Sequence, residues 1–176
     1  MQWRRLALDS YLRRLQEAVA SATHGMTVEE FTRHPEGKWS AGEVLEHLSL
    51  TYSGTVKGFE RCLQAGKPLA RRSTLKDRVA AALVVEVGYM PSGRQAPQHA
   101  RPRGRPAEEV LQQVGSQIAE MDEVIRQCEL RFGKHTPVLD HPFLGPLTAR
   151  QWRKFHWVHG RHHVKQIWRL RGKLTA

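Results

Sequence analysis

Apolar residues recur every three or four positions in four long segments of the chain, and this pattern is the strongest constraint on its fold. A stripe with this spacing lies along one face of an α-helix, so each segment predicts a helix with one buried face. Burying four such faces together predicts an all-α domain around one core. The first stripe comprises Leu8, Leu12, Leu15, Val19 and Ala22, and the third comprises Val110, Val114, Ile118, Met121, Ile125, Cys128 and Phe132.

Local signals mark the ends of these helices. Ser40 and Thr148 each precede a Glu or Gln three positions on, which is the spacing of a capping box at a helix N-terminus. Pro106 suits the first position of the third helix. A short helical turn is predicted at 28–31, and the Pro/Gly-rich segment 141–147 is predicted to be a loop that leads into the fourth helix.

The connection between the second and third helices, residues 67–106, is longer than a plain bundle needs. Residues 75–89 predict an additional helix, and residues 91–105 predict an exposed, mobile basic loop. One side of the additional helix carries Val79, Leu83 and Val87. A connection of this length lets the second and third helices run parallel, which short loops do not allow. The sequence therefore predicts one domain, residues 1–176, built as a four-helix bundle with an inserted helix and loop.

Composition and charge exclude several classes of protein. Hydrophobic residues make up 40% of the chain and charged residues 26%, a balance that excludes wholesale disorder. No run of about 18 apolar residues is present to span a membrane. The formal net charge of +11 favours nucleic acid, an acidic partner or small anions as ligands. Cys62 and Cys128 fit apolar helix faces, so both are expected in the core, and a reducing cytoplasmic location is expected.

The chain has ten histidines, and they are unevenly placed. At about 100° per residue, His156, His159 and His163 fall on the apolar stripe of the fourth helix, and basic residues occupy the opposite side. A single buried histidine is usually a core residue with satisfied nitrogens, but a pair at i and i+4 directs two imidazoles to one point. That arrangement suits a divalent cation with metal–nitrogen distances of about 2.0–2.1 Å.

A third ligand is expected from the second helix, where His47 follows the capping box. The same face carries Thr51, Gly54 and Gly58. The two glycines predict a groove beside His47, although close helix packing also accounts for small residues there. Three histidines without a carboxylate describe an open site in which water or substrate completes the metal's shell. Imidazole suits zinc and nickel alike, and the sequence does not choose between them.

Two motifs together resemble the DinB superfamily of four-helix metal proteins, including its bacillithiol S-transferase-like branch. The first is Trp39-Ser-Ala-Gly-Glu-Val-Leu-Glu-His47, and the second is His159-Gly-Arg-His-His163-Val-Lys-Gln166. The run from His141 to Gln166 is most similar to an uncharacterised branch of that superfamily. The resemblance covers the order of the elements over most of the chain, while its specific motifs occupy 39–47 and 141–166.

The resemblance implies an up-down-down-up bundle, often a homodimer, with a divalent metal held by His47, His159 and His163 and with Gln166 lining the site. It implies an enzyme that activates a low-molecular-weight thiol, such as bacillithiol or mycothiol, for transfer to a small molecule; hydrolysis by an activated water is the related reaction. His156 lies one turn before His159, so it either lines the pocket with Thr51, Gly54 and Gly58 or is a satisfied core histidine.

Other interpretations stay open at this point. Residues 102–106, Pro-Arg-Gly-Arg-Pro, match the core of an AT-hook, so Arg101, Arg103 and Arg105 are candidates for minor-groove DNA contacts. The alternative is a solvated loop that ends at a helix start. A metal held by the three histidines is also compatible with a purely structural role. A second apolar stripe on the fourth helix, comprising Trp157, Val164 and Trp168, fits either core packing or a docking surface.

Overall fold

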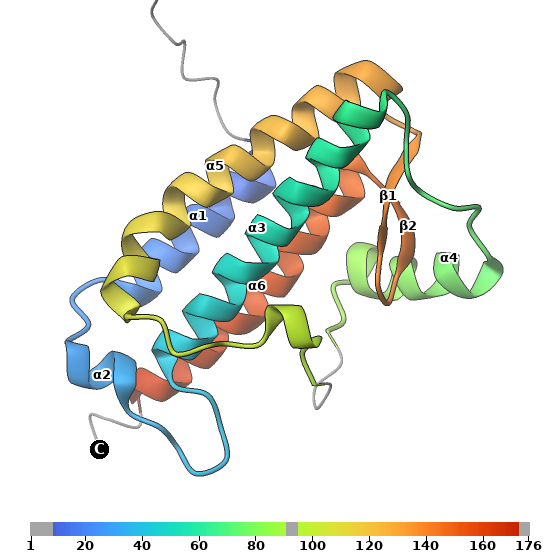
Figure 1. Cartoon of the computed structure of the whole chain (residues 1–176). Coiled ribbons are helices and arrows are strands. Elements are labelled where there is room, and N and C mark those ends of the chain that lie inside the picture. Colours follow the sequence, from blue (N-terminus) through green and yellow to red (C-terminus); the bar gives the residue numbers. More distant parts are fainter. Residues whose placement is uncertain (1–8, 91–94, 173–176) are drawn as a thin grey trace, which may run out of the picture.

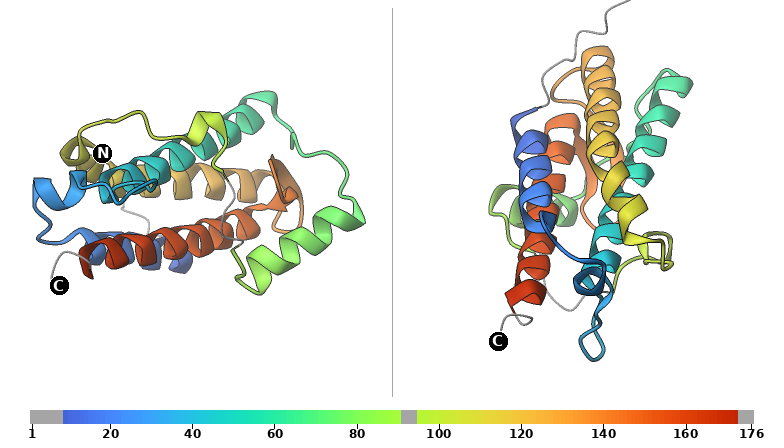
Figure 2. Two further views of the ribbon diagram at one scale, coloured as in Figure 1. Left: turned by 90° about the horizontal axis from the view of Figure 1, so that it is seen from below. Right: turned by 90° about the vertical axis from the view of Figure 1, so that its left-hand side faces the viewer.

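The computed structural model describes residues 9–90 and 95–172, and most of them are helical. Four long helices lie alongside one another in Figure 1 and in the rotated views of Figure 2. Among the described residues, no helix combines the length and the apolar composition that crossing a bilayer requires. The long helices are α1 (Ser10–Thr23), α3 (Ala41–Ala65), α5 (Ala107–Phe132) and α6 (Ala149–Gly172).

These helices coincide with the four periodic segments of the sequence, and their apolar faces meet in one core. Leu8, the first residue of the predicted N-terminal stripe, lies outside the described residues. Cys62 and Cys128 are buried and free, as predicted. Each large aliphatic side chain buried in this way stabilises the fold by about 1.5–3 kcal/mol. The largest fully buried side chains include Leu12, Leu15, Leu45, Leu48, Tyr52, Phe59, Ile118, Met121, Ile125 and Ile167.

The long helices do not simply alternate in direction. In Figure 1, α3 and α5 run the same way, while α1 and α6 run the opposite way. The chain between α3 and α5 makes this possible, because it returns from one end of the molecule to the other before α5 begins. A short loop would have forced the two helices to be antiparallel. The predicted parallel arrangement of these two helices is therefore present.

Both predicted capping boxes are present, and they fix the starts of the two helices that carry the candidate ligands. The Ser40 backbone N–H donates to Glu43 Oε2 at 2.8 Å, and the Glu43 backbone N–H donates to Ser40 Oγ at 3.2 Å. The corresponding distances between Thr148 and Gln151 are 3.0 and 3.3 Å. Each box satisfies two backbone groups that a helix start leaves unpaired. The first box places His47 in the second turn of α3.

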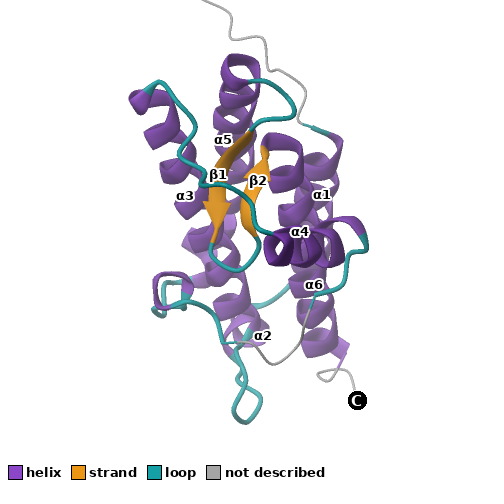
Figure 3. Cartoon of the chain, turned by 90° about the vertical axis from the view of Figure 1, so that its right-hand side faces the viewer, coloured by secondary structure: helices purple, strands orange, loops and turns teal. Residues whose placement is uncertain are grey.

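One element of the mostly helical fold differs from the loop that the sequence predicted before α6. The segment predicted to be a loop before α6 contributes to an antiparallel hairpin of β1 (Pro137–His141) and β2 (Gly145–Thr148), shown in Figure 3. Val138 and Leu147 are fully buried, so each strand has an inward side chain. In strands of only five and four residues, apolar and polar side chains alternate over too few positions to predict a strand within a Pro/Gly-rich sequence. The fold is therefore mostly helical, with one small sheet.

Shorter helical elements complete the fold. The turn predicted at 28–31 is α2 (Val28–Thr32), and the additional helix predicted at 75–89 is α4 (Leu75–Ala81), continued by a π-helical turn, η1 (Ala82–Glu86). A 3₁₀ turn, η2 (Gln98–Ala100), precedes α5. The inward side of α4 and η1 is formed by Ala81, Val84 and Val85, whereas Val79, Leu83 and Val87 are exposed.

A buried ion pair attaches α6 to α5. Arg153 Nε lies 2.8 Å from Asp122 Oδ1, and Arg153 Nη1 lies 2.7 Å from Glu129 Oε2. Only 6% of Arg153 is exposed, so both of its partners are needed to satisfy a guanidinium that has lost its water. This contact fixes the first turns of α6, directly before the segment that carries the histidines.

Candidate metal centre

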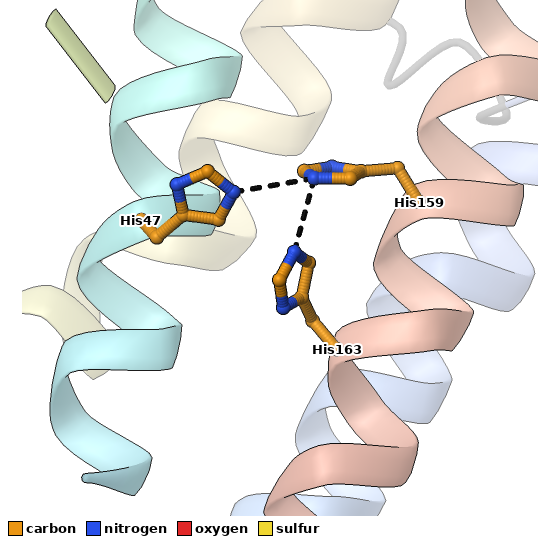
Figure 4. Close-up of side chains that lie close together, drawn as sticks. All are labelled: His47, His159 and His163. Atoms are coloured by element: carbon orange, nitrogen blue, oxygen red, sulfur yellow. Dashed lines mark hydrogen bonds between the residues drawn. The ribbon is translucent and has the colours of Figure 1, made fainter. Parts of the chain in front are cut away.

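Three histidines from two helices converge between α3 and α6, as Figure 4 shows. His47 lies on α3, and His159 and His163 lie one turn apart on α6. One ring nitrogen from each lies within 4.8 Å of those of the other two. The structure thus brings together the three residues that the sequence predicted as ligands, and they lie close enough to hold a metal ion.

Two of these histidines are oriented by hydrogen bonds from Nδ1. His47 Nδ1 lies 2.7 Å from the carbonyl oxygen of Ala100, and His163 Nδ1 lies 2.8 Å from Oε1 of Gln166. Both partners are oxygen acceptors, so each Nδ1 carries the proton and donates it. The Nε2 atoms of His47 and His163 are therefore unprotonated, and each directs a lone pair toward His159.

His159 cannot satisfy both neighbours at once. Its Nε2 lies 3.2 Å from Nε2 of His47 and 3.0 Å from Nε2 of His163. One proton on His159 serves only one of those lone pairs, and the other stays unpaired in a buried space. One cation accepts all three lone pairs. Tetrahedral zinc with bonds of about 2.0–2.1 Å places its nitrogen ligands about 3.3 Å apart, close to these spacings.

Burial keeps the three imidazoles neutral. Burial first, and neighbouring histidines second, lower the pKa of His163 to about 3 and lower the pKa of His159 well below its usual value. Burial also lowers the pKa of His47, an effect that the hydrogen bond to Ala100 opposes. Neutral imidazole is the form that binds a metal, so the residues are ready to act as ligands at neutral pH.

Aromatic rings cover two of the candidate ligands. The Trp39 ring lies 5.1 Å from the His47 ring, and the Phe155 ring stacks on His159 at 5.4 Å with an interplanar angle of 11°. These flat apolar surfaces limit the rotation of the imidazoles and exclude water from the faces that they cover. The histidines are therefore oriented by packing as well as by hydrogen bonds.

Gln166 and Thr51 both lie one turn or less from a candidate ligand. Gln166 contacts two histidines, because its Nε2 lies 3.2 Å from His162 Nε2 while its Oε1 accepts from His163. Thr51 follows His47 by one turn of α3, is half-buried, and donates its hydroxyl to the Leu48 carbonyl at 2.7 Å. Gln166 thus orients a ligand, and Thr51 bonds to its own helix.

Gly54 and Gly58, the two glycines predicted to form a groove, differ in the space around them. A Cβ placed on Gly54 would meet nothing within 4 Å, whereas one on Gly58 would lie 2.5 Å from Leu139 Cδ2. The predicted groove is therefore wrong at Gly58, because a side chain of the β-hairpin fills the space there. Sequence reasoning placed no strand in this region, so it had no side chain to pack against that glycine.

His156 lies deeper in the core than the candidate ligands. It is fully buried, and its Nε2 lies 3.0 Å from the hydroxyl oxygen of Thr55. That hydroxyl donates to the Thr51 carbonyl at 3.0 Å, so it accepts from His156, whose Nε2 carries the proton. This leaves His156 Nδ1 as an unprotonated atom. Among the described residues, the buried side-chain atoms without a hydrogen-bond partner are Tyr52 Oη, His156 Nδ1 and His159 Nδ1.

Replacing Tyr52 with phenylalanine is expected to stabilise the protein by about 1 kcal/mol, because the variant keeps the ring and removes a buried hydroxyl that has no partner. Chemical denaturation of the metal-free protein measures this difference. A loss of stability would show that the hydroxyl has a partner in solution, and Tyr11→Phe serves as the control at a tyrosine outside the core.

The sequence did not predict that residues 103–105, within the predicted loop, contact α3 beside His47. The backbone N–H groups of Arg103, Gly104 and Arg105 donate to the Glu46 carboxylate at 3.0, 3.0 and 3.1 Å. Glu46 is buried, but Glu43, Ser49 and Ser53 share its side of α3, so no apolar pattern in the sequence marked it as a buried carboxylate. Residues 91–94 of the predicted loop lie outside the described residues.

The arginines proposed as an AT-hook form local contacts. Arg101 Nη2 donates to Gln95 Oε1 at 2.9 Å, and Arg105 Nη2 donates to Gln113 Oε1 at 3.0 Å. With the backbone of residues 103–105 bound to Glu46, the segment is folded against α3 rather than extended for a groove. No observation here favours DNA binding over a structural use of these residues.

The fold and the site define a class of protein: mostly helical, with a buried cluster of three histidines able to hold a metal ion. The chain belongs to the family described as "Protein of unknown function (DUF1569)", whose sequence profile matches residues 9–169. It is also similar to "Uncharacterized protein YuaE" of Bacillus subtilis (strain 168), with 26% identity over 165 residues that cover 85% of this chain and 88% of the relative. No solved structure matches the chain.

Proposed function

We propose that this protein is a metal-dependent enzyme with a DinB-like, up-down-down-up four-helix bundle, in which His47, His159 and His163 hold a zinc or nickel ion. The observation that carries the proposal is the convergence of the Nε2 atoms of three neutral imidazoles, because His159 can donate a hydrogen bond to only one of its two neighbours. The parallel direction of α3 and α5 supports the bundle. A cation supplies the missing partner for all three lone pairs.

The donor set favours a catalytic ion over a purely structural one. Structural zinc sites are almost always closed by four protein ligands, whereas three histidines leave a position for a small molecule. A divalent ion in such a site lowers the pKa of a thiol or water that completes its shell. Gln166 holds the proton on His163 Nδ1, and Ala100 does the same for His47, so both keep their ligand tautomer.

The protein's own cysteines do not supply the thiol. Cys62 and Cys128 are fully buried in the core. Burial raises the pKa of Cys62 and raises the pKa of Cys128 to about 12, so both stay protonated and unreactive at neutral pH. The proposed nucleophile is therefore a thiol from solution, such as bacillithiol or mycothiol, or a water molecule.

A transfer assay tests this function. Zinc-loaded protein is expected to accelerate the reaction of bacillithiol with an electrophilic dye at least about tenfold over the same mixture with His163→Ala, and an activated ester reports hydrolysis in parallel. The variant removes one ligand and leaves every other residue in place. Equal rates for the two proteins with both substrates would contradict an enzymatic role for the cluster.

The proposal includes a homodimer formed through the exposed side of α4 and η1. Leu75 is 78% exposed and Val87 is 73% exposed. Together with Val79, Leu83 and Tyr89, which are also exposed, these residues place five large apolar side chains in water along one segment, a feature that marks interaction surfaces. A second copy presents the same self-complementary surface.

Light scattering at about 10 µM protein measures the mass, and a dimer is expected to dissociate when Leu83 is replaced by lysine. Glu60→Lys, on an exposed position of α3, is the control for added charge. A monomeric wild-type protein at this concentration, or a Leu83→Lys variant that stays dimeric, would contradict this interface.

A further inference from the structure

A buried carboxylate and a candidate ligand are neighbours in the sequence and contact the same segment. Glu46 is 1% exposed. Its Oε1 accepts from the Arg103 backbone N–H, and its Oε2 accepts from those of Gly104 and Arg105. A carboxylate removed from water needs donors of this kind, so the segment and Glu46 satisfy each other. We refer to residues 98–105 as the strap.

The strap reaches His47 through its other end. Ala100, at the end of the 3₁₀ turn, is 2% exposed, and its carbonyl oxygen accepts from His47 Nδ1 at 2.7 Å. Only Arg101 and Pro102 lie between this carbonyl and the Arg103 N–H group, the first that Glu46 binds. Glu46 and His47 therefore hold the strap at two points, one through a carboxylate and one through an imidazole.

Gly104 allows the strap to wrap around the carboxylate. Its φ of +81° belongs to the left-handed region that other residues rarely adopt. A turn of this kind directs successive backbone N–H groups into one concavity, which suits an anion. A Cβ on Gly104 would meet nothing within 4 Å, so an alanine there acts through the backbone conformation alone.

We propose that Glu46 is a positioning residue for the metal centre: by holding the strap, it keeps the Ala100 carbonyl where it orients His47 and holds the proton on Nδ1. This inference rests on the proposed function, because a positioning role for Glu46 presupposes a metal at His47. The readouts on metal-free protein described below do not depend on that function. Without the bonds to Glu46, the strap loses the contact that fixes Ala100. His47 then turns or carries its proton on Nε2, and in that tautomer Nε2 cannot bind a metal beside His159 and His163.

The test compares Glu46→Gln and Gly104→Ala with the wild-type protein, using Co²⁺ alone as the probe. Both variants are expected to weaken Co²⁺ binding about 10- to 100-fold, the usual effect of losing a group that orients a ligand. The double variant is expected to lose little more than either single variant, because both act on one contact. Glu60→Gln, on an exposed part of α3, is the matched control for the lost charge.

Two readouts on metal-free protein separate positioning from stability. ¹⁵N NMR of the histidines is expected to show His47 protonated on Nδ1 in the wild type and in mixed tautomers in the variants. Trypsin is expected to cleave after Arg103 faster in the variants, whereas the bonds after Arg101 and Arg105 precede proline and resist cleavage. A wild type that binds no Co²⁺ would overturn the proposed function, but these readouts would still decide the role of Glu46.

The role of Glu46 is contradicted by either of two results. In the first, cleavage after Arg103 rises in the variants while the His47 tautomer and the Co²⁺ affinity stay within about twofold of wild type, so Glu46 only anchors a loop. In the second, cleavage is unchanged in both variants, so the strap does not depend on Glu46. Gly104→Ala keeps the test valid if Glu46→Gln fails to fold, because its side chain has open space.

Discussion

Replacing His163 with alanine is expected to weaken zinc binding by about 10³-fold and to remove the thermal stabilisation that zinc provides. One of three ligands accounts for roughly 4 kcal/mol of a binding free energy of about 10–16 kcal/mol. At a zinc concentration of about 1,000 times the Kd, the wild type gains about 4 kcal/mol of stability, which corresponds to about 8–16 °C in the unfolding temperature of a protein this size. Isothermal titration and thermal unfolding with and without zinc measure the two effects.

His162→Ala is the matched control for this experiment. His162 is adjacent in the sequence but lies outside the cluster; its Nε2 contacts Gln166, and its ring lies edge-on to the His163 ring at 5.2 Å. Its loss is expected to change zinc affinity by less than about tenfold, through Gln166. Equal zinc-dependent stabilisation of the wild type and His163→Ala would contradict a metal bound by this cluster.

The metal-free protein is expected to lose several kcal/mol of stability as the pH falls from about 6.5 to 4. Burial lowers the pKa of His156 to about 3 and that of His141 to about 4, from an ordinary value of 6.5. Between these values the unfolded chain binds protons that the folded chain excludes, so the free energy of unfolding decreases as the pH decreases. Each of the two residues contributes about 3 kcal/mol to this loss at pH 4.

Urea unfolding at a series of pH values, with a chelator present, measures this dependence. Because glutamine does not titrate, His156→Gln is expected to lose about 3 kcal/mol less than the wild type between pH 7 and pH 4, whatever its stability at pH 7. His24→Gln, at an exposed position, is expected to follow the wild-type curve. Parallel curves for the wild type and His156→Gln would contradict burial of a neutral imidazole at this position.

Much of the fold could be predicted because local chemistry determines it. The capping boxes at Ser40 and Thr148 depend on residues three positions apart, and the helical stripes depend on a period that any core-facing helix shares. The three candidate ligands were predictable for the same reason. His159 and His163 are one turn apart on a helix, and His47 follows a capping box on the face of the second helix that carries Thr51, Gly54 and Gly58.

The parts that could not be predicted depend on contacts between distant segments. The β-hairpin is set by Val138 and Leu147 packing into the core, and five- and four-residue strands leave little periodicity to detect. The strap is set by backbone groups that meet Glu46 from more than 50 residues away in the chain. The sequence of the strap, rich in Arg, Pro and Gly, is equally typical of a mobile loop. Only the buried carboxylate of Glu46 distinguishes an anchored strap from such a loop.

The central claim is that one divalent ion binds Nε2 of His47, His159 and His163. A crystal structure of zinc-loaded protein, purified without a metal-affinity tag, tests it most directly when data are collected at the zinc absorption edge. The account predicts one strong anomalous peak about 2.0–2.1 Å from all three Nε2 atoms. An ion bound elsewhere, or no anomalous peak between α3 and α6 at saturating zinc, would contradict it.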